Sequence, residues 1–342
     1  MGNRSRLYAA IDLGSNTFHI LIAEGSKDSK ILHTVFKQRD YVFLSQNGVE
    51  HIDQDRYDLG IQTLQKYRKF IDLHEVSNYK VIGTETLRLA SNGSDFVREV
   101  KEKTDFDIEI IDGLKEANYI YYGVNAYLSE LQSEIKSEDQ SSVKSEIESY
   151  TSNDLASSVA RGVDETNIIM DIGGGSVEFI IFNRHTKKWA HSFPIGISIL
   201  FNNFQSQDPI GKDDLARLDS FLIEKTELLS KEVSKYNIQC MIGSAGSFDI
   251  LKEMMQHRIR TNENRIAVQD FIELYNGIIP LDFEQRKNIP GLPIERVKLM
   301  PMALSLLLYV IKTLNIKKII CCPYSLKEGV IYEMIDQIEG KV

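Results

Sequence analysis

The sequence predicts an α/β fold built from two similar halves, each a mixed β-sheet flanked by helices, with a cleft between them. Strand-like and helix-like apolar patterns alternate along most of the chain. Residues 11–17 (IDLGSNT) line up with residues 170–176 (MDIGGGS), and in both an Asp ends one strand and a Gly-containing turn leads into the next. A chain of 342 residues, 42% of them hydrophobic, can bury two ordinary cores, so a duplication is the simplest account.

The first half, residues 1–128, is expected to alternate short strands with amphipathic helices. The pattern over residues 7–22 predicts two strands joined by a turn at Gly14. Apolar residues at helical spacing from Tyr57 to Ile71 predict the first long helix. The remaining expected elements are strands at 31–36, 80–83 and 107–111, helices starting near 85 and 94, and a helix running through 128.

The second half, residues 167–342, repeats this order. Strands are expected at 167–172, 177–182, 188–193, 240–243 and 317–322, and a last helix at 326–340 can pack back on the first half. The segment 129–166 between the halves is rich in Ser, Glu and Asp and nearly devoid of aromatic residues. Such a composition buries too little surface to offset ordering entropy, so we expect a flexible insertion, with a charged helix around 131–147 as the alternative.

Charge and composition restrict the function. A net charge of −9 argues against a nucleic-acid surface, because phosphate backbones are bound by clustered Lys and Arg. A polyanionic substrate is still compatible if a few cations and backbone amides are focused in one cleft. Cys240, Cys321 and Cys322 lack zinc-site spacing and indicate buried thiols in a reducing compartment. Since neither a signal-peptide core nor a membrane-length apolar run is present, we expect a cytoplasmic protein without membrane partners.

The two matching Asp-Gly turns are the strongest functional signal. Glycines allow close backbone approach, and successive N–H groups form a concave site for an anion such as phosphate. Either turn alone is equally consistent with a tight hairpin whose polar side chains only bind turn amides, but two matching turns favour a phosphate site. The predicted phosphate-binding residues are Asp12, Gly14, Ser15, Asn16 and Thr17 in the first turn and Gly173, Gly174, Gly175 and Ser176 in the second.

A metal site and a third phosphate loop are expected beside these turns. Asp171 ends one strand and Glu178 lies seven residues later on the next, so both can reach one pocket and hold Mg²⁺ (or Mn²⁺). A loop of small residues also follows the strand at 240–243, where amides and a helix dipole would attract an anion. Its candidate residues are Gly243, Ser244, Gly246 and Ser247, a weak signal alone because many βα turns look like this.

Seven ordered segments carry a resemblance to a known family. They are AAIDLGSNTFHILIAE, GTETLRLASNGSDF, IIDGLKEANYIYYGV, DIGGGSVEFIIF, FPIGISIL, IGSAGSFD and YSLKEGV. From about residue 7 to residue 334, apart from the insertion, the chain resembles the exopolyphosphatase and guanosine-pentaphosphate phosphohydrolase family. The resemblance implies the duplicated ribonuclease-H-like fold shared with actin, in the short form that lacks the C-terminal helical module of long members.

The resemblance also implies catalytic roles. Glu116 occupies the second acidic position of the family's Gly-x-Glu-Glu-Ala motif, which makes it the general base, and Arg88 in the Thr-x-x-Leu-Arg motif would neutralise the transferred phosphoryl group. Without the resemblance, Glu116 fits a helix-capping residue and Arg88 a solvated helix residue. Lys115 replaces the first Glu of the motif and is expected to place a cation beside the base.

Two further residues stand in matched segments. Lys327 occupies a position where the family often has Arg, which makes it a candidate phosphate contact. His19 is expected to pack or hydrogen-bond on its strand rather than bind a metal, because no second His stands at ligand spacing.

The resemblance implies Mg²⁺-dependent hydrolysis of the terminal phosphoanhydride of inorganic polyphosphate or guanosine pentaphosphate by in-line attack of water. Two alternatives remain open from the sequence: an ATP-dependent kinase or ATPase of the same superfamily, and a sensor that binds polyphosphate or an alarmone without turnover. A homodimer is compatible with the sequence.

Overall fold

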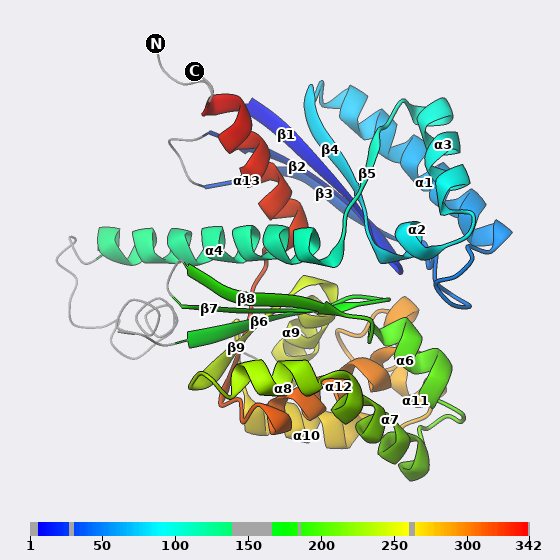
Figure 1. The fold of residues 1–342 in the computed structure, drawn as a ribbon, viewed down its shortest axis with the longest axis vertical. Helices are drawn as coiled ribbons and strands as arrows, with labels where there is room; N and C mark the ends of the chain where they lie inside the picture. Colours follow the sequence, from blue (N-terminus) through cyan, green and yellow to red (C-terminus); the bar gives the residue numbers. More distant parts are fainter. Residues whose placement is uncertain (1–5, 27–30, 139–165, 184–185, 260–263, 341–342) are drawn as a thin grey trace.

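Two mixed β-sheets, one in each half of the chain, form the framework of the protein (Figure 1). The computed structural model describes residues 6–26, 31–138, 166–183, 186–259 and 264–340. The first sheet has five strands in the order β3-β2-β1-β4-β5, and the second has six in the order β10-β11-β9-β6-β7-β8. The α/β fold with two mixed sheets and flanking helices is confirmed.

In the first half, three antiparallel strands come first and two parallel strands follow the first helix. Helices α1 and α3 pack on one face of the sheet, and α1 buries Tyr57, Ile61, Leu64 and Ile71, which share one helix face. The elements are β1 (Arg6–Leu13), β2 (Thr17–Gly25), β3 (His33–Tyr41), α1 (Gln54–Leu73), β4 (Asn78–Gly83), α2 (Glu85–Leu89), α3 (Gly93–Thr104), β5 (Ile108–Ile110) and α4 (Gly113–Glu138).

The second half repeats this strand order as β8-β7-β6-β9-β11 and adds β10 at the edge. Its helices enclose a separate apolar core around α12, which is buried on nearly every side. The elements are β6 (Thr166–Ile172), β7 (Val177–Asn183), β8 (Thr186–Phe193), α6 (Ile197–Phe204), α7 (Lys212–Lys225), α8 (Glu227–Val233), β9 (Ile238–Ser244), α9 (Ala245–Ile259), β10 (Arg265–Ala267), α10 (Val268–Ile278), α11 (Phe283–Arg286), η1 (Ile294–Arg296), α12 (Met300–Thr313), β11 (Lys318–Cys321) and α13 (Leu326–Glu339).

Strand register makes the two Asp-Gly turns equivalent. Asp12 lies opposite His19 in the β1/β2 pair, and Asp171 lies opposite Glu178 in the β6/β7 pair. The same backbone hydrogen bond closes each turn, from Gly14 N to Thr17 O at 3.1 Å and from Gly173 N to Ser176 O at 3.0 Å. The duplication expected from residues 11–17 and 170–176 is therefore present in the backbone itself.

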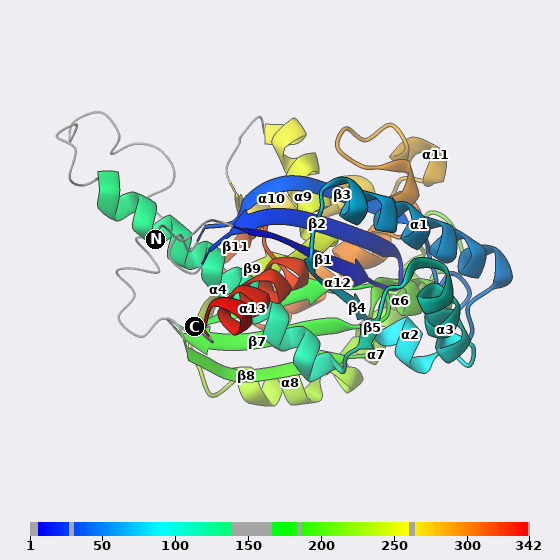
Figure 2. The ribbon, with the colours of Figure 1, turned by 90° about the horizontal axis from the view of Figure 1, so that it is seen from above.

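Helices α4 and α13 lie between the two sheets and contact both halves (Figure 1, Figure 2). Helix α13 packs on α4 and β1, as expected for a last helix returning to the first half, while α4 also contacts β7 and β8. One apolar cluster joins these elements, and its members include Tyr8, Leu21, Ile120, Val124, Ile180, Phe182, Val330 and Ile331. Burial of this shared layer holds the halves together.

No helix among the described residues is long and apolar enough to cross a membrane.

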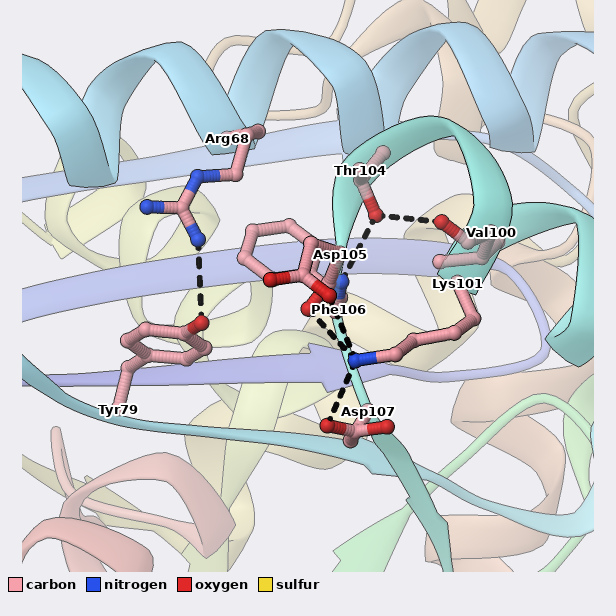
Figure 3. A network of polar contacts seen from close by, with 8 residues as sticks. All are labelled: Arg68, Tyr79, Val100, Lys101, Thr104, Asp105, Phe106 and Asp107. Carbon is pink, nitrogen blue, oxygen red and sulfur yellow. Dashed lines mark hydrogen bonds and ion pairs between the residues drawn. The ribbon is translucent and has the colours of Figure 1, made fainter.

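The turn between α3 and β5 precedes helix α4 in the chain and contains a network of polar contacts (Figure 3). Asp105 ends α3 in the left-handed region at φ 56°, and Phe106 N donates to Thr104 Oγ1 at 3.2 Å. Lys101 Nζ pairs with Asp105 at 2.7 Å and with Asp107 at 3.0 Å. Solvent screens these exposed ion pairs, so the fully buried ring of Phe106 is the main anchor.

Several boundaries differ from those expected. Strand β3 runs to Tyr41, well past 36, because pairing with β2 orders a polar segment that lacks a clear strand pattern. Helix α4 continues to Glu138, past the division expected at 128. The rest of the expected insertion, 139–165, lies outside the described residues. Helix α9 begins at Ala245, which places Gly246 and Ser247 in a helix rather than in a loop.

The crossing of α4 and α13 leaves no room for side chains at two glycines. A Cβ on Gly329 would overlap Tyr119 O, and a Cβ on Gly123 would overlap Ser325 O. We therefore expect Gly329→Ala to lower the free energy of unfolding by about 1–3 kcal/mol, despite the better helix propensity of Ala. Gly277→Ala on α10, where nothing lies within 4 Å, is the control and should be neutral or stabilising by up to about 1 kcal/mol. Urea unfolding of both variants measures this, and a Gly329→Ala midpoint equal to wild type would contradict it.

Candidate active site

A cavity of about 80 Å³ opens where the two Asp-Gly turns meet between the halves. Every residue predicted to bind phosphate in these two turns lines it. Glu116 from the first turn of α4, Asp171 and Arg296 complete the polar wall. The first residues of α9 and α13 also line the cavity, so two helix N-termini contribute to it, and such termini attract anions.

The two turns touch each other across the cavity. Ser198 Oγ on α6 donates to Asn16 Oδ1 at 2.8 Å. A Cβ on Gly174 would lie 2.7 Å from Asn16 Nδ2, and a Cβ on Gly175 would overlap Glu85 Oε2. Glycine at both positions permits this close approach, because a side chain at either would have to displace Asn16 or Glu85.

Serine hydroxyls orient the two predicted metal ligands. Glu178 Oε1 accepts hydrogen bonds from Ser176 Oγ at 2.7 Å and from Ser192 Oγ at 2.6 Å. Asp171 Oδ2 accepts one from Ser244 Oγ at 2.8 Å. Asp171 lines the cavity and is buried, while Glu178 lies just behind the wall on β7. The structure thus brings both carboxylates to the second turn with fixed orientations.

Four carboxyl groups, which we call the acidic cluster, share this buried space: Asp12, Asp171, Glu178 and Glu116. Burial raises the pKa of Asp171 to about 6, that of Asp12 to about 7 and that of Glu178 to about 8. Repulsion by Asp171 adds to the last two shifts. Burial and then repulsion by Glu178 and Asp12 raise the pKa of Glu116 well above its ordinary value.

Glu116 stands at the start of α4 with one carboxylate oxygen unsatisfied. Its N–H donates to Asp112 O at 2.9 Å, and its buried Oε2 has no hydrogen-bond partner. The expectation that Lys115 places a cation beside this base is wrong. Lys115 pairs with Glu109 at the surface, because consecutive helix residues do not face the same side.

Arg88 lies near the cavity but does not line it. Its side chain is exposed and Nη1 donates to Ile111 O at 2.5 Å, in the segment that leads into α4. Its charge lowers the pKa of Glu116, which places the guanidinium within electrostatic reach of the acidic cluster. A direct contact with a transferred phosphoryl group therefore remains a prediction.

Positive groups gather near the first turn of α9, and we call Arg39, Arg296 and Lys327 the basic cluster. A Cβ on Gly246 would lie 3.4 Å from Arg39 Nη2 and 3.5 Å from Arg296 Nη2. Arg39 pairs with Asp249 at 2.7 Å across the two halves. Although burial alone would lower it, Glu328, Asp249 and Asp12 raise the pKa of Lys327.

His19 lies among these cations and lines the cavity. Its Nε2 is 3.0 Å from Thr17 Oγ1, in agreement with the expectation that it hydrogen-bonds on its strand. Burial lowers its pKa well below the ordinary value, and Lys327, Arg39 and Arg296 lower it further. His19 is therefore neutral, and the positive charge of the basic cluster comes from Arg39, Arg296 and Lys327 alone.

The third predicted phosphate loop serves mainly as a support. Ser244 Oγ donates to Asp171 Oδ2, and Ser247 Oγ donates to Ile172 O at 3.2 Å. Gly243 packs against the ring of Phe248. Among these candidates only Gly246 lines the cavity. The small residues thus allow β9 and α9 to approach the second turn closely.

Four buried side-chain atoms at this site have no hydrogen-bond partner in the described part of the chain. Two are donors, Asn16 Nδ2 and Arg296 Nε, and two are acceptors, Glu85 Oε2 and Glu116 Oε2. Buried polar atoms are normally paired, so unpaired ones at a cavity mark where a ligand supplies the partner. The donors suit anionic oxygens, and the acceptors suit water or a cation.

Sequence reasoning missed four residues of this site. Arg39 and Arg296 lie in segments without a motif, Ser192 directly precedes the segment FPIGISIL, and Glu85 occupies an unspecified position of the Thr-x-x-Leu-Arg motif. Arg39 pairs with Asp249, 210 residues away, and no local signal could have found that contact. Ser192 meets Glu178 as its opposite residue in the β7/β8 pair, a contact that depends on the strand register.

The sequence matches the Ppx/GppA phosphatase family over residues 21–136 and 144–338, which is most of the chain. This chain belongs to the Ppx/GppA phosphatase family. The match confirms the resemblance carried by the seven segments and makes the protein a phosphohydrolase.

Solved structures agree with the family. The exopolyphosphatase from Cytophaga hutchinsonii is 29% identical, with a TM-score of 0.82 over 97% of this chain and 99% of that one. The PPX-GPPA enzyme from Aquifex aeolicus is 21% identical, with a TM-score of 0.71 over 96% of this chain and 99% of that one. An exopolyphosphatase-like protein is 16% identical, with a TM-score of 0.78 over 97% of this chain and 98% of that one. The last two support the fold alone.

The raised pKa of Glu178 predicts a pH-dependent stability. Its pKa rises from an ordinary 4.5 to about 8, so the folded chain binds this proton more tightly than the unfolded chain does. The stability that this tighter proton binding adds to the folded chain is fully present below about pH 4.5. It is lost as the pH rises toward 8 and Glu178 ionises in the folded chain. In EDTA, Glu178→Gln should therefore flatten the decline in the free energy of unfolding between about pH 5 and 8.

Urea unfolding at several pH values measures this slope. Glu224→Gln, at an exposed carboxylate paired only with Lys225, is the control and should keep the wild-type slope. Equal slopes for Glu178→Gln and wild type would show that Glu178 is already ionised in the folded protein.

Proposed function

We propose that this phosphohydrolase cleaves the terminal phosphoanhydride of inorganic polyphosphate or guanosine pentaphosphate with the help of a divalent cation. The observation that carries the proposal is the presence of two kinds of unpartnered buried atom at the same site. Asn16 Nδ2 and Arg296 Nε are donors, and Glu116 Oε2 and Glu85 Oε2 are acceptors. Similarity to the Cytophaga hutchinsonii exopolyphosphatase favours polyphosphate.

In this proposal the two turns and the basic cluster hold the phosphates. Backbone N–H groups of the turns and of the α9 and α13 N-termini supply donors in fixed positions, which stabilises negative charge without reorganisation. Arg296 adds charge at the cavity wall and Lys327 adds charge near Asp12, and Arg88 would approach the transferred group from the α2 side. This focused charge explains how a chain of net charge −9 can take a polyanion.

The acidic cluster fits a divalent cation such as Mg²⁺ or Mn²⁺. Its carboxylates are hard oxygen ligands, and burial raises the pKa values of Asp171 and Glu178 because their charged forms lack compensation by solvent. The described residues contain no group of three or more His, Cys, Asp or Glu ready to hold a metal alone. Mg²⁺ commonly keeps several waters and uses one or two carboxylates with substrate oxygens, so Asp171 and Glu178 would suffice. When bound, the cation would neutralise charge on the phosphoryl oxygens.

Glu116 is the proposed general base. When positive charge offsets its carboxylate neighbours, Glu116 is ionised and its free Oε2 can accept a proton from water. The water oxygen then bonds to the terminal phosphorus as the bond to the bridging oxygen breaks, and the shortened chain leaves with its negative charge.

The free thiols Cys321 and Cys322 suit a reducing compartment such as the cytoplasm, and a homodimer remains a prediction.

We expect Glu116→Gln to lower kcat by about 10²–10⁴, because the amide keeps the shape but cannot accept a proton. Binding of polyphosphate should stay close to wild type. Lys115→Gln, at the neighbouring surface position, is the control and should keep kcat within a few-fold. Phosphate release at saturating substrate measures both, and wild-type turnover by Glu116→Gln would remove this residue from the mechanism.

Asp171→Asn should raise the Mg²⁺ concentration needed for half-maximal activity, since hard cations prefer charged oxygens. The same change at Asp214, a buried carboxylate bonded to Ser206 and Arg217, is the control. Titration of phosphate release with Mg²⁺ gives both values. Unchanged half-saturation for Asp171→Asn would place the cation elsewhere.

One panel tests the function as a whole. Phosphate release from polyphosphate, guanosine pentaphosphate and ATP is measured with and without Mg²⁺. We expect release from at least one of the first two, only with Mg²⁺. Release from ATP alone would favour a nucleotide-dependent enzyme, and binding of polyphosphate without any release would indicate a sensor.

A further inference from the structure

Glu85 is a buried carboxylate that the proposed mechanism leaves without a role. It is the first residue of α2 and only 4% exposed. Its Oε2 has no hydrogen-bond partner in the described part of the chain. A Glu at the start of a helix usually accepts a bond from a backbone amide, but Oε2 of Glu85 points instead toward Gly175 in the opposite half of the protein.

The carboxylate of Glu85 ends against the second Asp-Gly turn. It occupies the space where a Cβ of Gly175 would lie, and Gly175 is followed by Ser176, which donates to Glu178. Glu85 is close enough to Glu178 for their charges to repel. Its position is fixed from its own half, because Thr86 Oγ1 donates to Ser15 Oγ at 2.8 Å.

The same corner also contains Glu116. Arg88, one turn after Glu85, donates to Ile111 O just before α4, which ties the start of α2 to the start of α4. A Cβ on Gly113 at the start of α4 would overlap Ser192, the second hydroxyl on Glu178. These contacts bring the starts of α2 and α4 close to the second turn, with Glu116 lining the cavity and Glu85 and Glu178 near each other beside it.

An ionised carboxylate in this position requires a positive partner. Burial of an unpaired charge costs several kcal/mol, and Arg88 attracts Glu85 only from a distance while its Nη1 serves a carbonyl. A divalent cation with its waters would supply the missing donors to two oxygens at once, Glu85 Oε2 and Glu116 Oε2.

We propose that Glu85 is a further metal-holding residue of the active site, which binds a divalent cation or one of its coordinated waters beside Gly175. The inference deepens the proposed function and rests on it, since it concerns the same cation. Loss of a residue that holds a ligand or its water typically weakens metal affinity about 10–100-fold.

The test measures Mn²⁺ binding to the full chain without substrate, by electron paramagnetic resonance. Glu85→Gln should weaken Mn²⁺ binding about tenfold or more. Its melting temperature in EDTA should be equal to or above that of wild type, because the amide removes an unpaired buried charge. Asp214→Asn is the matched control, a buried carboxylate whose oxygens are bonded far from the cavity, and it should keep wild-type Mn²⁺ affinity.

Each outcome decides the matter. Wild-type Mn²⁺ affinity in Glu85→Gln overturns the inference, as does a lower melting temperature with unchanged affinity, which would make Glu85 structural. Absence of Mn²⁺ binding by the wild-type chain overturns it too. The proposed function fails by a different result. If the wild-type chain binds Mn²⁺ through Glu85 but releases no phosphate from either substrate, the metal site is supported and the proposed reaction is rejected.

Discussion

Burial of several carboxyl groups at one place is the constraint on which the site depends. Asp12, Asp171, Glu178 and Glu116 reach one small space from both sheets and from α4, and burial raises the pKa of each. A fold can hold these four buried carboxyl groups together only if the packing around them is stable enough to offset the cost of burying them. Here the apolar layer shared by α4, α13 and both sheets supplies that stability, and it leaves the carboxylates ready for a positive partner.

Duplication followed by divergence explains the polarity of the cleft. Asp12 and Asp171 occupy equivalent places in their sheets, but the residues paired with them differ, His19 in one half and Glu178 in the other. Around His19 stand Lys327, Arg39 and Arg296, while Glu178 is held by two serine hydroxyls near other carboxylates. One ancestral turn could thus become two surfaces, one suited to phosphate and one suited to a cation.

Close backbone approach connects the fold to the chemistry. Gly174 and Gly175 let the second turn touch the first, and Gly123 and Gly329 let α4 and α13 cross without intervening side chains. The same crossing sets the direction of two helix N-termini, where Glu116 begins α4 and Ser325 caps α13. The packing between the halves and the placement of the reactive groups are therefore set by the same contacts.

The sequence by itself determined the α/β class, the order of most strands and helices, the equivalence of the two turns and, through the family resemblance, the phosphohydrolase activity. These follow from local periodicity and from motifs a few residues long. The extension of α4 to Glu138, the polar strand β3, the surface pairing of Lys115 and the contacts of Arg39, Arg296, Ser192 and Glu85 were decided by the tertiary structure. Each of these depends on which side chains meet across the two sheets. A partner far away in the sequence, as Gly175 is for Glu85, leaves no trace in the local sequence.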